Sequence, residues 1–109
     1  MALNVSSIDT VLATTDTTVA TSLALTQVTV LKCSVLNTDS SPHSISLYRV
    51  PLAGSASASN QIIKDYVLGA NATVVLPIAG QVLYNGQSFV ATASANSSVT
   101  FSISLATTP

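Results

Sequence analysis

The sequence predicts an all-β fold, an antiparallel β-sandwich of about seven strands in a single domain. Val, Ile and Thr are abundant among the 109 residues, and such β-branched side chains favour strands. Apolar and polar residues alternate in several segments, and turn-forming residues recur at intervals of about ten residues. Alanine occurs mainly beside Ser or Thr rather than in helical blocks, so we expect no helix.

The N-terminal part has a character of its own. Residues 10–24 are rich in Thr with scattered Val, Leu and Ala, which fits a first strand or an extended arm laid on another subunit. We favour a strand with a short arm ahead of it. Residues 1–26 are therefore taken as an N-terminal arm, a first strand or both, and residues 27–109 as the β-sandwich domain.

Two strands separated by loops are expected next. Residues 27–36 carry apolar side chains on both faces, which is typical of a central strand covered on both sides. Residues 44–50 alternate, with Ile45 and Leu47 facing one way, and the proline that follows stops the strand. Composition places loops at residues 37–43 and 52–60.

The following stretch contains two strands and two turns. Residues 62–68 form a strand, and residues 69–71 form the turn after it. Residues 72–78 form a mostly apolar strand, and Pro77 makes it an edge strand or ends it there, because proline cannot donate to a strand ladder. The Asn-Gly pair in residues 84–87 is a strong turn signal and should reverse the chain.

The last two strands are the clearest. Residues 99–106 alternate between apolar and small polar side chains, which indicates a half-buried strand with one face inward. In residues 89–95, Phe89 and the alanines at every second position alternate with Val90, Thr92 and Ser94. The short polar link at residues 96–98 is interpreted as the loop of a hairpin between them.

Charged residues are scarce, and this excludes several classes of function. The chain has three Lys or Arg, four Asp, no Glu, one His and one Cys, while Ser and Thr supply 31 residues. Without a basic stripe we expect no nucleic-acid partner. No apolar run approaches 18 residues, so we expect no membrane partner, and nothing near Met1 resembles a secretory signal. Cys33 stands alone and is expected to be buried as a small apolar residue.

Catalytic, cofactor and metal sites are not expected. His43 has no second His and no neighbouring Cys or Glu, so we interpret it as a solvated loop residue. A Ser-His-Asp set is arithmetically available, but the sequence contains no GxSxG nucleophile elbow. Paired carboxylates for glycoside hydrolysis could come only from Asp9, Asp16, Asp39 and Asp65, and their spacing proposes no pair. We therefore expect no enzyme, no cofactor and no small-molecule substrate.

The other polar and aromatic residues are expected to have structural roles rather than functional ones. Arg49 could form an ion pair or be a solvated charge at the end of a strand. A sugar-binding module would offer exposed aromatic rings, above all Trp, and this chain has no Trp. The tyrosines are expected at the edge of the core with wet hydroxyls, at positions Tyr48, Tyr66 and Tyr84. The Asn-x-Ser/Thr triplets are expected to be chance products of the composition, at Asn4, Asn71 and Asn96.

Four segments carry a family resemblance. In order they read VLKCSVLNTDSS, SLYRVPLAGSASASNQIIKD, ATVVLPIAGQVLYNGQSF and VATASANSSVTFSISLA. This succession resembles small virion structural proteins of tailed bacteriophages, with a "LYxVP" strand end, a Ser/Gly-rich loop, a "GQVL" segment and an alternating last strand. The resemblance covers residues 27–106, and the first 26 residues lie outside it.

The resemblance implies a β-sandwich subunit that coats or joins parts of a phage particle. The expected function is capsid decoration, with the major capsid protein or other virion proteins as partners and a homo-oligomer, a trimer by preference, as the assembled form. The alternative is a tail, baseplate or fibre module that meets the host surface or joins virion parts. The expected location is the virion, assembled in the cytoplasm of the host bacterium.

Overall fold

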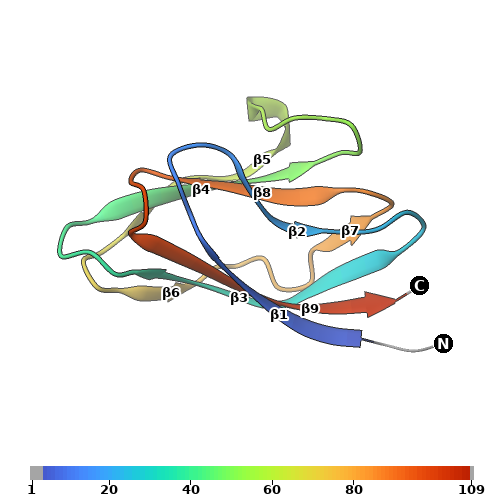
Figure 1. Cartoon of the computed structure of the whole chain (residues 1–109), viewed down its shortest axis with the longest axis horizontal. Coiled ribbons are helices and arrows are strands. Elements are labelled where there is room, and N and C mark those ends of the chain that lie inside the picture. Colours follow the sequence, from blue (N-terminus) through green and yellow to red (C-terminus); the bar gives the residue numbers. More distant parts are fainter. Residues whose placement is uncertain (1–3, 109) are drawn as a thin grey trace.

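Residues 4–108 are described by the structure, a computed structural model, and they form two antiparallel β-sheets packed face to face (Figure 1). The nine strands are β1 (Asn4–Val11), β2 (Thr17–Thr21), β3 (Gln27–Asn37), β4 (His43–Val50), β5 (Gln61–Leu68), β6 (Thr73–Val75), β7 (Val82–Tyr84), β8 (Ser88–Ala93) and β9 (Val99–Thr108). One turn of 3-10 helix, η1 (Ala58–Asn60), precedes β5.

The order of the strands defines the topology. The first sheet has the order β1-β9-β3-β6, with β7 also paired to β3, and the second sheet has the order β2-β8-β4-β5. Since β6 and β7 pair with different parts of β3, they act as two pieces of one interrupted strand. The chain otherwise passes from one sheet to the other at almost every connection, and only β4 and β5 are consecutive full strands of one sheet. This is the arrangement of an eight-stranded jelly roll.

The predicted β-sandwich is confirmed, with nine strands in place of about seven. The predicted hairpin at residues 96–98 is wrong, because β8 lies in the second sheet and β9 in the first. The loop crosses the gap between the sheets, and β9 pairs with β1 and β3 instead. Alternation defines two half-buried strands but carries no information on which strand each one pairs with.

The Asn-Gly turn is confirmed. Asn85 has φ 52° and Gly86 has φ 89°, as a turn with two left-handed central residues requires. The N–H of Gln87 donates to the carbonyl of Tyr84 at 3.2 Å. Here too the flanking strands belong to different sheets. The strand before Pro77 is also confirmed as an edge strand, β6, which is three residues long.

Strand β3 corrects the prediction of a strand covered on both faces. Its outward face is open, with Leu31 47% and Leu36 37% exposed. The register against β9 shifts between Val30 and Lys32, so one extra residue enters the strand there. This bulge brings Val30 and Cys33 onto the same inward face although they are three residues apart. Residues 27–36 therefore have apolar side chains at both odd and even positions because of the bulge. Within residues 4–108, no second layer of the protein covers the outer face of β3.

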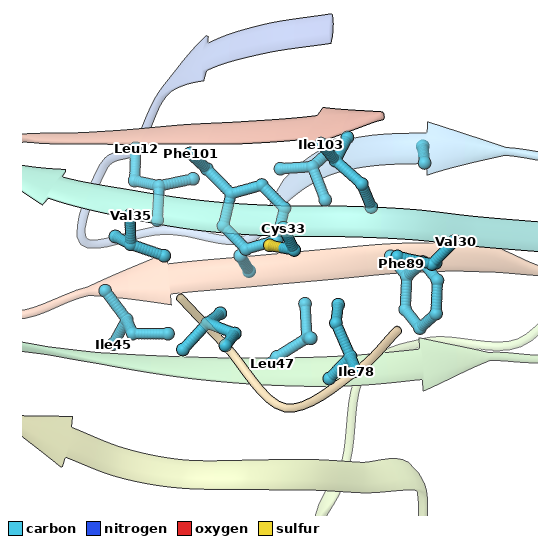
Figure 2. Close-up of a cluster of buried hydrophobic side chains, with 14 of the residues drawn as sticks. Leu12, Val30, Cys33, Val35, Ile45, Leu47, Ile78, Phe89, Phe101 and Ile103 are labelled. Carbon is cyan, nitrogen blue, oxygen red and sulfur yellow. The ribbon is translucent and has the colours of Figure 1, made fainter. Parts of the chain in front are cut away.

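The core lies between the sheets. Its largest fully buried side chains include Phe89 from the second sheet and Phe101 from the first. In Figure 2, labelled side chains from both sheets point into the shared space, among them Cys33, Ile45 and Leu47. Ile45 and Leu47 are 1% and 0% exposed, so their predicted common face is the core face.

The N-terminal segment forms two strands within the described residues. β1 pairs along its whole length with β9, and β2 pairs with β8 in the other sheet. Residues 1–3, where the predicted short arm would begin, lie outside the described residues. The division into residues 1–26 and 27–109 stays a prediction.

Candidate functional site

A polar cluster forms where the loop between β3 and β4 meets the end of β8. At its base is Asn37, the last residue of β3, which is 0% exposed. Its Nδ2 donates to the carbonyls of Ser41 (2.9 Å), Gly69 (3.2 Å) and Leu68 (3.4 Å). Its Oδ1 accepts the N–H of Asp39 at 3.0 Å. A buried amide thus holds the loop 38–42 against the β5–β6 turn.

The same loop brings Asp39, His43 and Ser94 into one chain of hydrogen bonds. His43 Nε2 lies 2.8 Å from Asp39 Oδ2, and Ser94 Oγ lies 3.3 Å from His43 Nδ1. His43 is the first residue of strand β4, and its side chain is only 16% exposed. The prediction of a solvated loop histidine is therefore wrong. The fold joins residues that are 51 positions apart in sequence, which spacing along the chain could not reveal.

This chain of hydrogen bonds has the residue types of a Ser-His-Asp triad but the contacts of a structural tie. Ser94 Oγ accepts the N–H of Ser44 at 2.9 Å, and the N–H of Ser94 donates to the carbonyl of Ser44 at 2.9 Å. Asp39 Oδ1 accepts the N–H of Ser40 at 2.7 Å. One of the two lone pairs of the Ser94 hydroxyl is taken by the N–H of Ser44, so Ser94 is bound to the start of β4 through both its side chain and its backbone. The cluster fastens the start of β4 to the end of β8.

The Asp39 carboxylate makes stability depend on pH. The hydrogen bond from His43, followed by that from the N–H of Ser40, holds the pKa of Asp39 below its ordinary range. Because the folded pKa is the lower one, the stabilisation is present above the unfolded pKa and is lost as pH falls through the folded pKa. We expect urea midpoints to drop on acidification from about pH 7 to about pH 2, and to drop less in Asp39→Asn. Asp16→Asn, at an exposed loop carboxylate, is the matched control, and an equal acid response in all three proteins would contradict this role.

A shallow hollow on the outer face of the second sheet holds a further carboxylate. It has a volume of about 120 Å³ and is lined by Ser44, Ser46, Asp65, Thr92, Ala93 and Ser94. The N–H of Asp65 donates to Ser46 Oγ at 3.0 Å, and Ser46 Oγ donates to Asp65 Oδ1 at 3.4 Å. Asp65 has φ 48°, so its backbone is in the left-handed region, at a point where the pairing of the edge strand β5 with β4 is irregular. The hydroxyls and the carboxylate therefore bond mainly within the sheet.

The remaining candidate residues are dispersed. Arg49 donates to Gln81 Oε1 at 3.0 Å rather than to a carboxylate. Burial raises the pKa of the Cys33 thiol to about 12, so this sulfur stays protonated. Tyr48 Oη accepts from Gln61 Nε2 at 3.3 Å, while Tyr66 and Tyr84 are 37% and 47% exposed.

The remaining aspartates and the triplet asparagines are spread over several elements. Asp9 lies on β1 and Asp16 in the loop before β2. The triplet asparagines lie on β1, in the turn before β6 and in the loop before β9, at Asn4, Asn71 and Asn96.

Residues 4–108 contain neither a metal-binding cluster nor a membrane-spanning helix. No three His, Cys, Asp or Glu side chains of this part of the chain gather closely enough to hold a metal ion. The described residues contain no helix long and apolar enough to cross a bilayer.

The most extensive candidate site is a surface, the outward face of the first sheet, which we name the contact face. Directly opposed residues of an antiparallel pair share a face, so the register places Thr100, Ser102, Ser104 and Ala106 of β9 at its centre, because Phe101 and Ile103 point inward. Exposed apolar side chains surround this centre, with exposed fractions of 37% to 66%, at Val5, Val11, Leu36, Val75 and Tyr84. The charged side chains that the register places on this face are Asp9 and Lys32.

Sequence patterns pointed only to parts of this surface. The alternation of residues 99–106 identified the polar side of β9, but the apolar rim comes from strands that are distant in sequence. Because β1, β3, β6 and β7 reach the same sheet only through the crossovers, a single-strand pattern could not assemble the contact face.

Comparison with known proteins gives no family. No protein-family model and no curated protein sequence matches the chain. Among solved structures, it is similar to a chain of Bacillus endospore appendages, described as a novel family of disulfide-linked pili, with TM-score 0.48 and 12% identity over 97% of this chain and 84% of that one. It is also similar to chains of infectious bursal disease virus: in the Gx strain TM-score 0.44 and 14% identity, and in the T13 particle TM-score 0.46 and 12% identity.

The virus chains are much longer than this one. The chain covers 32% and 30% of their length, while 95% and 96% of this chain is covered. At these scores and identities the similarities transfer no residue role to this chain.

Proposed function

We propose that this chain is a non-enzymatic structural subunit of a bacteriophage virion and that it serves as a capsid decoration protein. The contact face carries the proposal. Exposed apolar side chains around a centre of Ser, Thr and Ala suit a surface that packs against another protein. The small uncharged side chains of β9 let a partner approach closely, and Asp9 and Lys32 are the two charges on this face that the partner has to match or leave in water.

In this function the contact face binds the major capsid protein or another virion protein, and the opposite sheet faces outward. Copies of the chain also assemble with one another, in the trimer or other small ring that shell symmetry favours. The site of action is the virion, assembled in the cytoplasm of a bacterial host. A place in the tail, baseplate or fibre is the second candidate, because an apolar contact face would equally join tail parts.

Particle binding by two matched variants tests the proposal. Val75 is 59% exposed on the contact face, and Val67 is 68% exposed on β5 of the second sheet. We expect Val75→Asp to lower the number of copies bound per purified particle by about tenfold or more, because a buried unpaired carboxylate opposes binding. Val67→Asp should bind like the wild type. Quantitative mass spectrometry of particles gives the ratio to the shell protein.

Antibody labelling of intact particles then gives the position. Label over the head, together with lower heat resistance of particles that lack the chain, supports capsid decoration. Label confined to the tail replaces decoration with the tail function. Particles that never contain the chain, or equal loss of binding in both variants, would overturn the structural function proposed here.

A further inference from the structure

Strand β1 is a sheet edge that lacks most of the features that usually prevent edge-to-edge pairing, and Asp9 is its one charged residue. It is eight residues long, and its register against β9 runs from Asn4–Thr107 to Val11–Thr100 without a bulge. Its sequence, NVSSIDTV, contains no proline and no lysine. A long, regular edge strand presents a row of N–H and carbonyl groups to any strand that can pair with it.

The other sheet edges are protected. β2 is five residues long and its register shifts between Thr18 and Ala20. The register between β5 and β4 shifts twice, and β5 carries Lys64. β6 and β7 are three residues each. Short strands, bulges and lysines are the means by which proteins block such edges, so β1 differs from every other edge among the described residues.

The side chains of β1 are also exposed. Val5 is 66%, Ile8 38% and Val11 57% exposed. Val5 and Val11 belong to the contact face, whereas Ile8 lies opposite Ile103 and points to the inner side of the sheet. Figure 1 shows β1 (blue) beside β9 (red) at the edge of the first sheet. Three apolar side chains on an open edge favour a partner strand.

We propose that β1 pairs antiparallel with β1 of a second copy of this chain, in a register centred on Ile8. The apolar residues of β1 are symmetric about that position, with Val5 three residues before it and Val11 three residues after it. In an antiparallel pair of identical strands, this register places Val5 opposite Val11 of the second copy and Ile8 opposite Ile8 of the second copy. Every large apolar side chain of the edge then meets another one.

The register keeps the faces of the two sheets aligned. Residues that meet are both odd or both even in number, so outward side chains meet outward side chains. The two first sheets join into one continuous sheet across a two-fold axis, and the two contact faces become one surface. This is an isologous contact, which closes on two copies.

Asp9 is the unfavourable element of this register. It lies opposite Ser7 of the second copy, and the two Asp9 carboxylates lie diagonally, about 7 Å apart. We expect Asp9→Asn to tighten the dimer, since it removes this repulsion. An Asp9→Asn variant that dimerises more weakly than the wild type would contradict the register.

The pairing does not depend on the proposed function, because it is measured on the isolated chain. A two-fold dimer and a trimer are different assemblies, so a trimer would need a second surface. Loss of particle binding through Val75→Asp with an intact dimer, or loss of the dimer with intact particle binding, tells the two proposals apart.

Site-directed disulfides test the register directly. Opposite residues of an antiparallel pair have Cα atoms about 4.5 to 5.5 Å apart, within the range of about 4.4 to 6.8 Å that a disulfide bridges. Ile8→Cys is therefore expected to form a covalent dimer on mild oxidation. Val5→Cys should not link to itself, because the two copies of residue 5 lie about 20 Å apart, but should link when mixed with Val11→Cys. The native thiol of Cys33 does not interfere, because it is 0% exposed.

Sedimentation equilibrium on the reduced proteins completes the experiment. Ile8→Lys should raise the dissociation constant of the dimer by about tenfold or more, because it sets two ammonium groups against each other. Val67→Lys and Val67→Cys, on an edge strand of the other sheet, are the matched controls for charge and for an exposed thiol. A wild-type chain that stays monomeric up to about 500 µM, or crosslinking of Ile8→Cys no faster than Val67→Cys, overturns the proposal.

Discussion

Replacing Phe101 with alanine is expected to lower the free energy of unfolding by about 3 to 5 kcal/mol. Phe101 is 0% exposed, and its strand β9 is paired on both sides, with β1 and β3. Figure 2 shows its ring between the two sheets, near Leu12 and Val35. Small domains are stable by only about 5 to 15 kcal/mol, so this single truncation removes a large part of the stability.

Urea unfolding followed by far-UV circular dichroism measures this effect. Tyr84→Ala is the matched control, since it also removes an aromatic ring, but one that is 47% exposed on β7. We expect it to cost about 1 kcal/mol or less. Equal losses in the two variants would show that the space between the sheets is not the main core.

Replacing Asn37 with leucine is expected to cause the second large loss in the free energy of unfolding. Asn37→Leu removes the donor shared by the carbonyls of Ser41, Leu68 and Gly69 and the acceptor for the N–H of Asp39. Buried polar groups left without partners cost about 1 to 3 kcal/mol each. We expect a total loss of about 2 to 4 kcal/mol in the free energy of unfolding, because part of the loop can reach water.

Asn37→Asp separates this hydrogen-bonding role from simple packing. A carboxylate would point at three carbonyl oxygens, so its charged form is disfavoured and its pKa rises in the folded state. The penalty is then present at neutral pH and relieved on acidification, opposite in sign to the effect of Asp39. Asn96→Asp is the control, because Asn96 Oδ1 accepts the N–H and the hydroxyl of Thr14, at 2.9 Å and 3.4 Å, and a carboxylate can accept both. If both Asp variants lose equal stability at neutral pH, the donor role of Asn37 is refuted.

Local patterns predicted the fold class because the determinants of a single strand are local. Residues 99–106 alternate, and β9 has alternating buried and half-buried positions over Val99–Leu105. The Asn-Gly pair takes left-handed dihedrals wherever its strands go. Pro77 ends strand pairing because it lacks an N–H, which is also a property of the residue alone.

Pairings between distant strands could not be predicted in the same way. The link at residues 96–98 resembles a hairpin loop, but it crosses between sheets because β9 is stabilised by β1 and β3, which lie far away in sequence. The bulge in β3 likewise depends on its register with β9. Local residues cannot encode a register that only a distant strand defines.

The polar cluster shows the same division at the level of side chains. His43 in a Ser- and Pro-rich segment looked solvated, yet the crossover after β8 carries Ser94 to its Nδ1 and Asp39 meets its Nε2. Asn37 looked like a loop residue and is a fully buried one. The sequence around His43 and Asn37 does not set these two residues apart from the other polar residues of the chain. They are distinguished only by the hydrogen-bond partners that the fold brings to them.

From residue types and their order alone, this chain is recognisable as an all-β domain with few charged residues, whose strands each bury one face. Side-chain branching and two-residue periodicity act within a single strand, so they can be recognised without the partner strands. Only the tertiary arrangement decided which strands became neighbours, where the contact face lies and that β1 is left as an open edge. The reason is physical: strand pairing and burial are contacts between segments remote in sequence, and their energies depend on both partners.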